Sequence, residues 1–142
     1  MSDLSNRLAL REQMQHAENV RRNREHEALL RHAPEGWERF KVAFREECDA
    51  INSQVNLTRL ECIEPTQQSF DIVRVRLHTP PVGMLTFRFI ADAPCIIWQD
   101  LLNKSQKTIE MVSDESAVHF TLGGNALVLG RFLESCIEAI WP

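Results

Sequence analysis

The chain has 142 residues, with 16 basic and 20 acidic side chains and a formal net charge of −4. Apolar residues make up 44% and charged residues 25%, which is typical of an ordinary globular domain. The longest apolar runs fall far short of the ~20 residues of a membrane-spanning helix, and the polar N-terminal region lacks the apolar stretch of a secretory signal. Mild acidity gives no general attraction to nucleic acid or anionic membranes. We therefore expect a cytoplasmic protein that binds neither.

Residues 1–33 form a polar segment that favours helix. It contains six arginines, five acidic residues and no glycine or proline, so its net charge is +1. Its one apolar stripe (Leu10, Met14, Ala17 and Val20) is narrow and then stops, and the sustained heptad repeat of a coiled coil is absent. We predict a polar helical arm over 1–33 and a single α+β domain over 34–142.

The sequence between His32 and Gly36 interrupts this helical pattern. Pro34 is predicted to end the first helix or to stand in the first turn of the next. Apolar residues then recur at three- and four-residue steps, which indicates a second helix with a wide apolar face; they are Trp37, Phe40, Phe44, Cys48, Ile51 and Val55. Charged residues, Lys41 among them, are expected on the opposite face.

From residue 56 to residue 122 the apolar period changes to two, which indicates strands. The predicted strands are Leu57–Ile63, Phe70–Leu77, Met84–Ala91, Cys95–Asp100, Thr108–Val112 and Ala117–Leu122. The sequence 79–83, with two prolines, is a turn, and 103–107 is a polar loop. Connections this short cannot contain crossover helices, so we expect an antiparallel meander of five or six strands.

Gly123 and Gly124 are expected to end the last strand, with Asn125 as the N-cap of a final amphipathic helix. The predicted fold is therefore α+β. It is a two-layer domain with a helix before the sheet, a helix after it and a long polar N-terminal helix.

The outward sheet face is predicted to carry a basic cluster. In the predicted strand Phe70–Leu77, Val73 and Val75 are expected to face inward, which puts the intervening arginines outside. Similar alternation applies to the other strands. The candidate ligand-binding residues are Arg59, Arg74, Arg76, Arg88 and His119. Arginine side chains suit carboxylates and phosphates, so a small anion could dock there. The alternative is an ordinary polar outer face, since Glu61 and Glu110 would neutralise much of the charge.

The sequence shows no pattern that requires catalysis. Cys95 and His119 could approach across strands with Asp100 or Asp71 as an orienting carboxylate, but their spacing does not demand it. The cysteines, Cys48, Cys62, Cys95 and Cys136, lack zinc or redox spacing and are expected to be buried, reduced thiols. No two histidines stand at i, i+4. We expect no catalytic residues, no metal and no cofactor.

These observations favour a small interaction or assembly module without catalytic activity. We expect a protein partner, with self-association into a homodimer or larger homo-oligomer, because the arm cannot bury enough surface alone. The predicted partner-binding residues are Leu4, Leu8, Leu10, Met14, Leu29 and Leu30. A free sheet edge is a second route to association. The alternative function is a binding protein or cryptic enzyme for a small anionic ligand on the arginine-rich sheet face.

Overall fold

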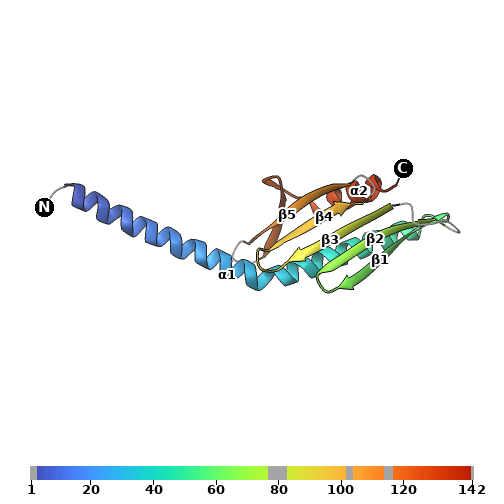
Figure 1. The fold of residues 1–142 in the computed structure, drawn as a ribbon, viewed down its shortest axis with the longest axis horizontal. Helices are drawn as coiled ribbons and strands as arrows, with labels where there is room; N and C mark the ends of the chain where they lie inside the picture. Colours follow the sequence, from blue (N-terminus) through green and yellow to red (C-terminus); the bar gives the residue numbers. More distant parts are fainter. Residues whose placement is uncertain (1–2, 77–82, 102–103, 114–116, 142) are drawn as a thin grey trace.

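A computed structural model describes residues 3–76, 83–101, 104–113 and 117–141, and its fold is α+β (Figure 1). The two helices are α1 (Asp3–Asn52) and α2 (Leu129–Ala139). The strands are β1 (Thr58–Thr66), β2 (Ser69–Arg76), β3 (Gly83–Ile90), β4 (Cys95–Asp100), β5 (Ser105–Ser113), β6 (Val118–Leu122) and β7 (Asn125–Ala126). Each strand pairs antiparallel with the next, so the predicted meander is confirmed with seven strands in place of five or six. No described helix is long and apolar enough to cross a membrane.

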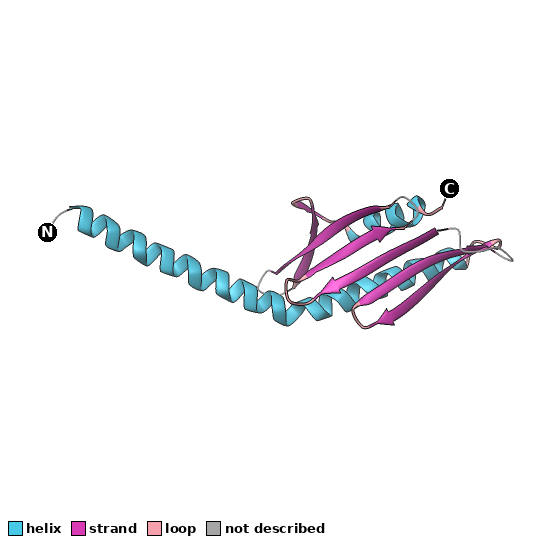
Figure 2. Ribbon diagram, in the orientation of Figure 1, coloured by secondary structure: helices cyan, strands magenta, loops and turns pink. Residues whose placement is uncertain are grey.

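Both helices cover the same face of the sheet, and the core lies between them and the strands (Figure 2). The predicted apolar face of the second helix supplies the centre of that core. Phe40 and Phe44 are fully buried, and their ring centroids lie 5.2 Å and 4.7 Å from that of Phe87 on β3. The ring centroid of Phe132 on α2 lies 6.4 Å from the ring centroids of Phe40 and of Phe44. One aromatic cluster therefore joins both helices to the sheet.

The predicted break at Pro34 is wrong, because α1 continues through it as a single 50-residue helix. Ala33, Gly36 and Trp37, on either side of the proline, are buried against the sheet, whereas Pro34 itself is exposed. Packing thus holds both flanks in helical geometry while the proline ring lies on the solvent side. A proline inside a helix loses one hydrogen bond and bends the axis, and α1 changes direction where it reaches the sheet (Figure 1).

Two strand boundaries differ from the prediction by three residues, and the other described boundaries agree to within one residue. β1 runs past Pro65 to Thr66, with an irregularity in its register after Ile63. Because β1 is an edge strand, a proline there removes no hydrogen bond that the sheet needs. β5 begins at Ser105, inside the predicted polar loop, where it pairs with Asp100. Of the turn predicted over 79–83, residues 79–82 lie outside the described residues.

Asn125 does not cap the final helix. It belongs to the short strand β7, which β6 joins through Gly123 and Gly124, at φ of 60° and 82°. These left-handed conformations favour glycine and close a tight hairpin. Helix α2 begins after Val128, which offers no side-chain cap. The two glycines therefore build a hairpin, and they do not prepare a helix N-terminus for an anion.

We predict opposite effects for two glycine-to-alanine substitutions. An alanine Cβ at Gly83 would lie 2.9 Å from Ile140 Cβ and 3.1 Å from the Ile140 carbonyl oxygen, so Gly83→Ala should lower the free energy of unfolding by about 1–3 kcal/mol. Gly130 of α2 has open space around it, so Gly130→Ala should raise that free energy by up to about 1 kcal/mol. Urea unfolding measures both. A Gly83→Ala protein as stable as wild type would show that α2 does not end against β3.

Candidate functional site

The outward placement predicted for Arg74 is wrong. Phe70 and Ile72 of β2 are fully buried on the helix side of the sheet, and Arg74 follows them at the same period of two. Its register partner on β1, Leu60, is also buried. Two sets of apolar residues alternate in β2, Phe70 with Ile72 and Val73 with Val75, and they point to opposite faces. The Phe70 ring buries the larger apolar area, so the set that contains it faces the helices. Val73 therefore points to the outer face.

Arg74 reaches the C-terminal end of α2 and is only 2% exposed. Its Nη1 atom donates a hydrogen bond of 2.9 Å to the carbonyl oxygen of Ile140. Its guanidinium carbon lies 4.8 Å from the centroid of the Trp141 ring. Trp141 was not among the predicted site residues. A cation at the C-terminus of a helix also interacts favourably with the helix dipole.

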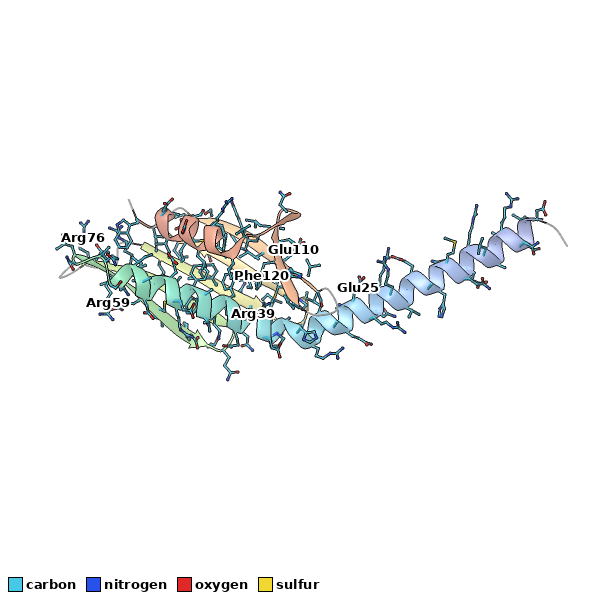
Figure 3. All side chains as sticks on the ribbon, turned by 180° about the vertical axis from the view of Figure 1, so that it is seen from behind. Glu25, Arg39, Arg59, Arg76, Glu110 and Phe120 are labelled. Atoms are coloured by element: carbon cyan, nitrogen blue, oxygen red, sulfur yellow. The ribbon has the colours of Figure 1, made fainter. Side chains whose placement is uncertain are left out.

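The other candidate residues of the outer face do not form one cluster. Arg59 pairs with Val75, Arg88 lies between Ser69 and Ile97, and His119 pairs with Val112. No two of Arg59, Arg88 and His119 are direct cross-strand neighbours. Arg76, one period after Arg74, lines a hollow with Arg74 and Trp141 at the end of the sheet. Arg59 and Arg76 lie at the end of the molecule away from Glu25 on the projecting part of α1 (Figure 3).

A shallow polar depression of about 220 Å³ does lie on the outer face. Asp71, Thr86, Gln99 and Gln106 form one cross-strand row over β2 to β5, and Arg88 lines the depression beside them. Burial raises the pKa of the Asp71 carboxyl above its ordinary value. Thr86, Gln99 and Gln106 are uncharged, and the acidic Asp71 offsets the basic Arg88, so the depression is polar rather than basic.

The proposed nucleophile and base are not brought together. Cys95 on β4 pairs with Glu110 of β5, and β5 separates it from His119 on β6. Burial, and then the charge of Glu110, raise the pKa of the Cys95 thiol, which disfavours the reactive thiolate. Cys48 and Cys136 are buried as predicted, whereas Cys62 and Cys95 are half-buried. Among the described residues no group of three or more His, Cys, Asp or Glu side chains could hold a metal ion.

Lys41 was expected on the charged face of its helix, but it is 2% exposed. Its Nζ atom lies 2.8 Å from Glu38 and 3.4 Å from Glu64, and 5.4 Å from the centroid of the Trp37 ring. Glu64 also pairs with Arg45. These acids compensate the buried charge, so the group ties α1 to the edge strand β1 and has a structural role.

The N-terminal part of α1 extends beyond the sheet as a projecting arm, which we define as residues 3–28 (Figure 1). At 1.5 Å per residue it is about 39 Å long. Its large apolar side chains are Leu4, Leu8, Leu10 and Met14, which are 50–64% exposed. Leu30, just beyond the arm, is 40% exposed, whereas Leu29 packs against the core. Four of the six predicted contact residues therefore lie on the arm itself.

A groove of about 490 Å³ lies where the arm leaves the sheet. Small apolar residues of the arm, Ala17, Val20 and Ala28, form its floor, and Ser113 at the end of β5 stands on one side. Arg21, Arg24 and Glu25 complete its lining. Leu10 and Met14 lie on the same stripe of the helix, about two turns and one turn before Ala17. The arm thus carries bulky apolar residues at its tip and a shallow groove at its base.

Comparison of the chain with protein-family models, with curated proteins and with solved structures found no match. Only the geometry of the arm, the outer-face depression and the hollow at Arg74 therefore bears on function.

We predict that Asp71 lowers stability at neutral pH. Its raised pKa means that the folded chain binds the proton more tightly than the unfolded chain, so stability falls as the pH rises and Asp71 ionises. Asp71→Asn should therefore be more stable than wild type at pH 7, and the difference should shrink below the ordinary value of 3.8. Urea unfolding between pH 3 and pH 7 measures this. Asp92→Asn removes the same charge from an exposed turn, and a matching pH effect there would contradict the assignment to Asp71.

Proposed function

We propose that this protein is an assembly module that forms a homodimer through its projecting arm. The observation that carries the proposal is the exposed arm itself, because Leu4, Leu8, Leu10 and Met14 face solvent on a helix that is fixed to the core at its base. Isolated helices gain little stability without a packing partner. A second copy of this chain supplies such a partner.

The apolar stripe of the arm suits an antiparallel pairing of two copies. Leu10 and Met14 of one arm would enter the groove formed by Ala17, Val20 and Ala28 of the partner subunit. A two-fold axis relates the two subunits, so Leu10 and Met14 of each subunit occupy the groove of the other. Bulky side chains packed over small ones let two helices approach closely along their length.

Charges on the arm support the same arrangement. In this pairing Arg7 and Arg11 lie opposite Glu25 of the partner subunit, and all three positions flank the apolar stripe on one side at 3.6 residues per turn. Within one chain, Glu18 pairs with Arg21 and Arg22 and offsets part of their positive charge in the middle of the arm. Complementary charges of this kind set orientation and register more than affinity.

The sheet edges are less suited to association. The outer edge of β1 carries Pro65 and an irregular register, and β7 at the other edge has two residues. Prolines, bulges and short strands are the features that prevent edge-to-edge pairing. The arm is therefore the better candidate for the contact between subunits.

The four cysteines form no disulfide, which suits a reducing compartment such as the cytoplasm.

We predict that the full-length wild-type chain has twice its 16.4 kDa mass in solution. Leu10→Glu with Met14→Glu should produce a folded monomer, because two charges on the stripe cannot be buried in the partner's groove. Light scattering coupled to gel filtration measures the mass, and circular dichroism checks the fold.

Asn19→Glu with Asn23→Glu is the matched control, since it adds the same charge with the same spacing on another side of the arm. This variant should stay dimeric. A wild-type protein that is monomeric up to its solubility limit would overturn the proposal, and so would a control variant that dissociates as the stripe variant does.

A charge exchange tests the antiparallel register. Arg11→Glu alone and Glu25→Arg alone should each raise the dissociation constant of the dimer, and the double variant should recover most of the loss. Exposed pairs contribute about 0.2–1 kcal/mol each, and this pair occurs twice in a symmetric dimer. Analytical ultracentrifugation over a range of concentrations measures the constants. Arg11→Glu combined with Glu27→Arg, whose new charge lies on another side of the helix, should show no recovery; equal recovery would exclude this register.

A further inference from the structure

At the opposite end of the molecule from the arm, the sheet and the C-terminal end of α2 enclose a hollow of about 710 Å³. Its walls are Arg74 and Arg76 of β2, Trp141, residues 55–57 between α1 and β1, and Thr58 at the start of β1. The volume falls within the range of about 300–1,000 Å³ that small-molecule sites occupy. Arg76 and the neighbouring Arg59 mark this end of the sheet in Figure 3.

Arg74 has unused hydrogen-bonding capacity in this hollow. Within the described part of the chain, its guanidinium makes one hydrogen bond, from Nη1 to the carbonyl oxygen of Ile140 at 2.9 Å. Its Nε atom is buried and has no hydrogen-bond partner. Buried polar atoms in folded proteins nearly always have a partner, so an unpartnered one beside a hollow indicates a missing acceptor. A guanidinium presents its donors in a planar fork that matches an oxyanion.

The charge of Arg74 is also uncompensated. Among the described residues it forms no ion pair with a carboxylate, unlike the buried Lys41, which has two acidic neighbours. Burial, and then the positive charge of Arg76, lower the pKa of Arg74. Arginine nevertheless stays charged in proteins, so the site keeps two cations next to each other. An anion bound between them would relieve this repulsion.

Apolar walls accompany the cations. The Trp141 ring stacks against the Arg74 guanidinium, and Leu57, 77% exposed, stands at the rim with Val55 beside it. Asn56 and Thr58 add side chains that can donate hydrogen bonds. The hollow thus pairs a charged end with a flat aromatic surface.

From this arrangement we propose that the hollow is a binding site for a small organic anion, one with a flat apolar body and a carboxylate or phosphate group. The anionic group accepts hydrogen bonds from Arg74 and the charge of Arg76 attracts it, while the apolar body lies against Trp141 and Leu57. This site is separate from the outer-face arginines, and binding here does not depend on the arm.

Titration of the full-length protein with benzoate and with phenyl phosphate tests the site, with tryptophan fluorescence as the readout. Both probes, or one of them, should give a saturable change, and the tighter of the two identifies the preferred anionic group. Benzyl alcohol, the neutral analogue, should give none. Arg76→Gln should weaken binding about tenfold or more, as expected for loss of an interaction with a charged group.

Three further variants keep the test decisive. Arg59→Gln removes the same charge near the same end of the sheet but from the outer face, and should bind as wild type does. Trp141→Phe should abolish the fluorescence change while the probe still raises the melting temperature. This result would assign the fluorescence signal to Trp141 and not to the other two tryptophans. Arg74→Lys keeps the positive charge but lacks the planar donors of the guanidinium, so it should bind the probes more weakly. If this variant does not fold, the Arg76 and Trp141 variants still show whether the hollow binds the anion.

Absence of saturable binding with both anions up to their solubility limits would overturn the proposal. Equal binding of benzyl alcohol would overturn it as well, because the arginines would then play no part. So would equal loss of affinity in Arg59→Gln and Arg76→Gln, which would indicate general electrostatic attraction and no specific site.

Discussion

The packing of one helix face on one sheet face is the interaction on which the rest of this structure depends. Phe40 and Phe44 of α1 are fully buried against Phe87 of β3, and among the described elements only the shorter α2 shares this face of the sheet. An antiparallel sheet needs one face covered, and burying each such side chain contributes about 1.5–3 kcal/mol. Helix α2 completes the layer through Phe132. Where α1 lies on the sheet therefore determines where every other surface lies.

The same packing gives the arm its direction. Ala33 and Trp37 hold the helix on the sheet on either side of Pro34, so the arm continues an element that is already anchored. A binding segment whose geometry is set in advance loses less conformational entropy on association than a flexible tail does. The exposed ion pairs of Glu18 with Arg21 and Arg22 add modest support to the helical state.

The two proposed surfaces lie at opposite ends of the molecule, as Glu25 of the arm groove and Arg76 of the hollow show in Figure 3. The proposed dimer uses the arm near the N-terminus, whereas the hollow at Arg74 is built from β2, Trp141 and residues 55–58. Most of the sheet lies between them, and only residues at the ends of β1, β2 and β5 contribute to either surface. Each surface is therefore open when the other is occupied, and a dimer would present two hollows, one at each outer end.

The sequence by itself determined the antiparallel meander, because the connections between strands are too short for crossover helices. It also determined the apolar face of α1, because a wide apolar stripe at three- and four-residue steps is compatible only with a helix that buries one side. It did not determine which way Arg74 points. In β2 both Phe70 with Ile72 and Val73 with Val75 are apolar, so local alternation allows two faces, and only pairing with β1 and β3 selects one. The continuity of α1 at Pro34 was likewise decided by tertiary packing, because contacts on both sides outweigh one lost backbone hydrogen bond.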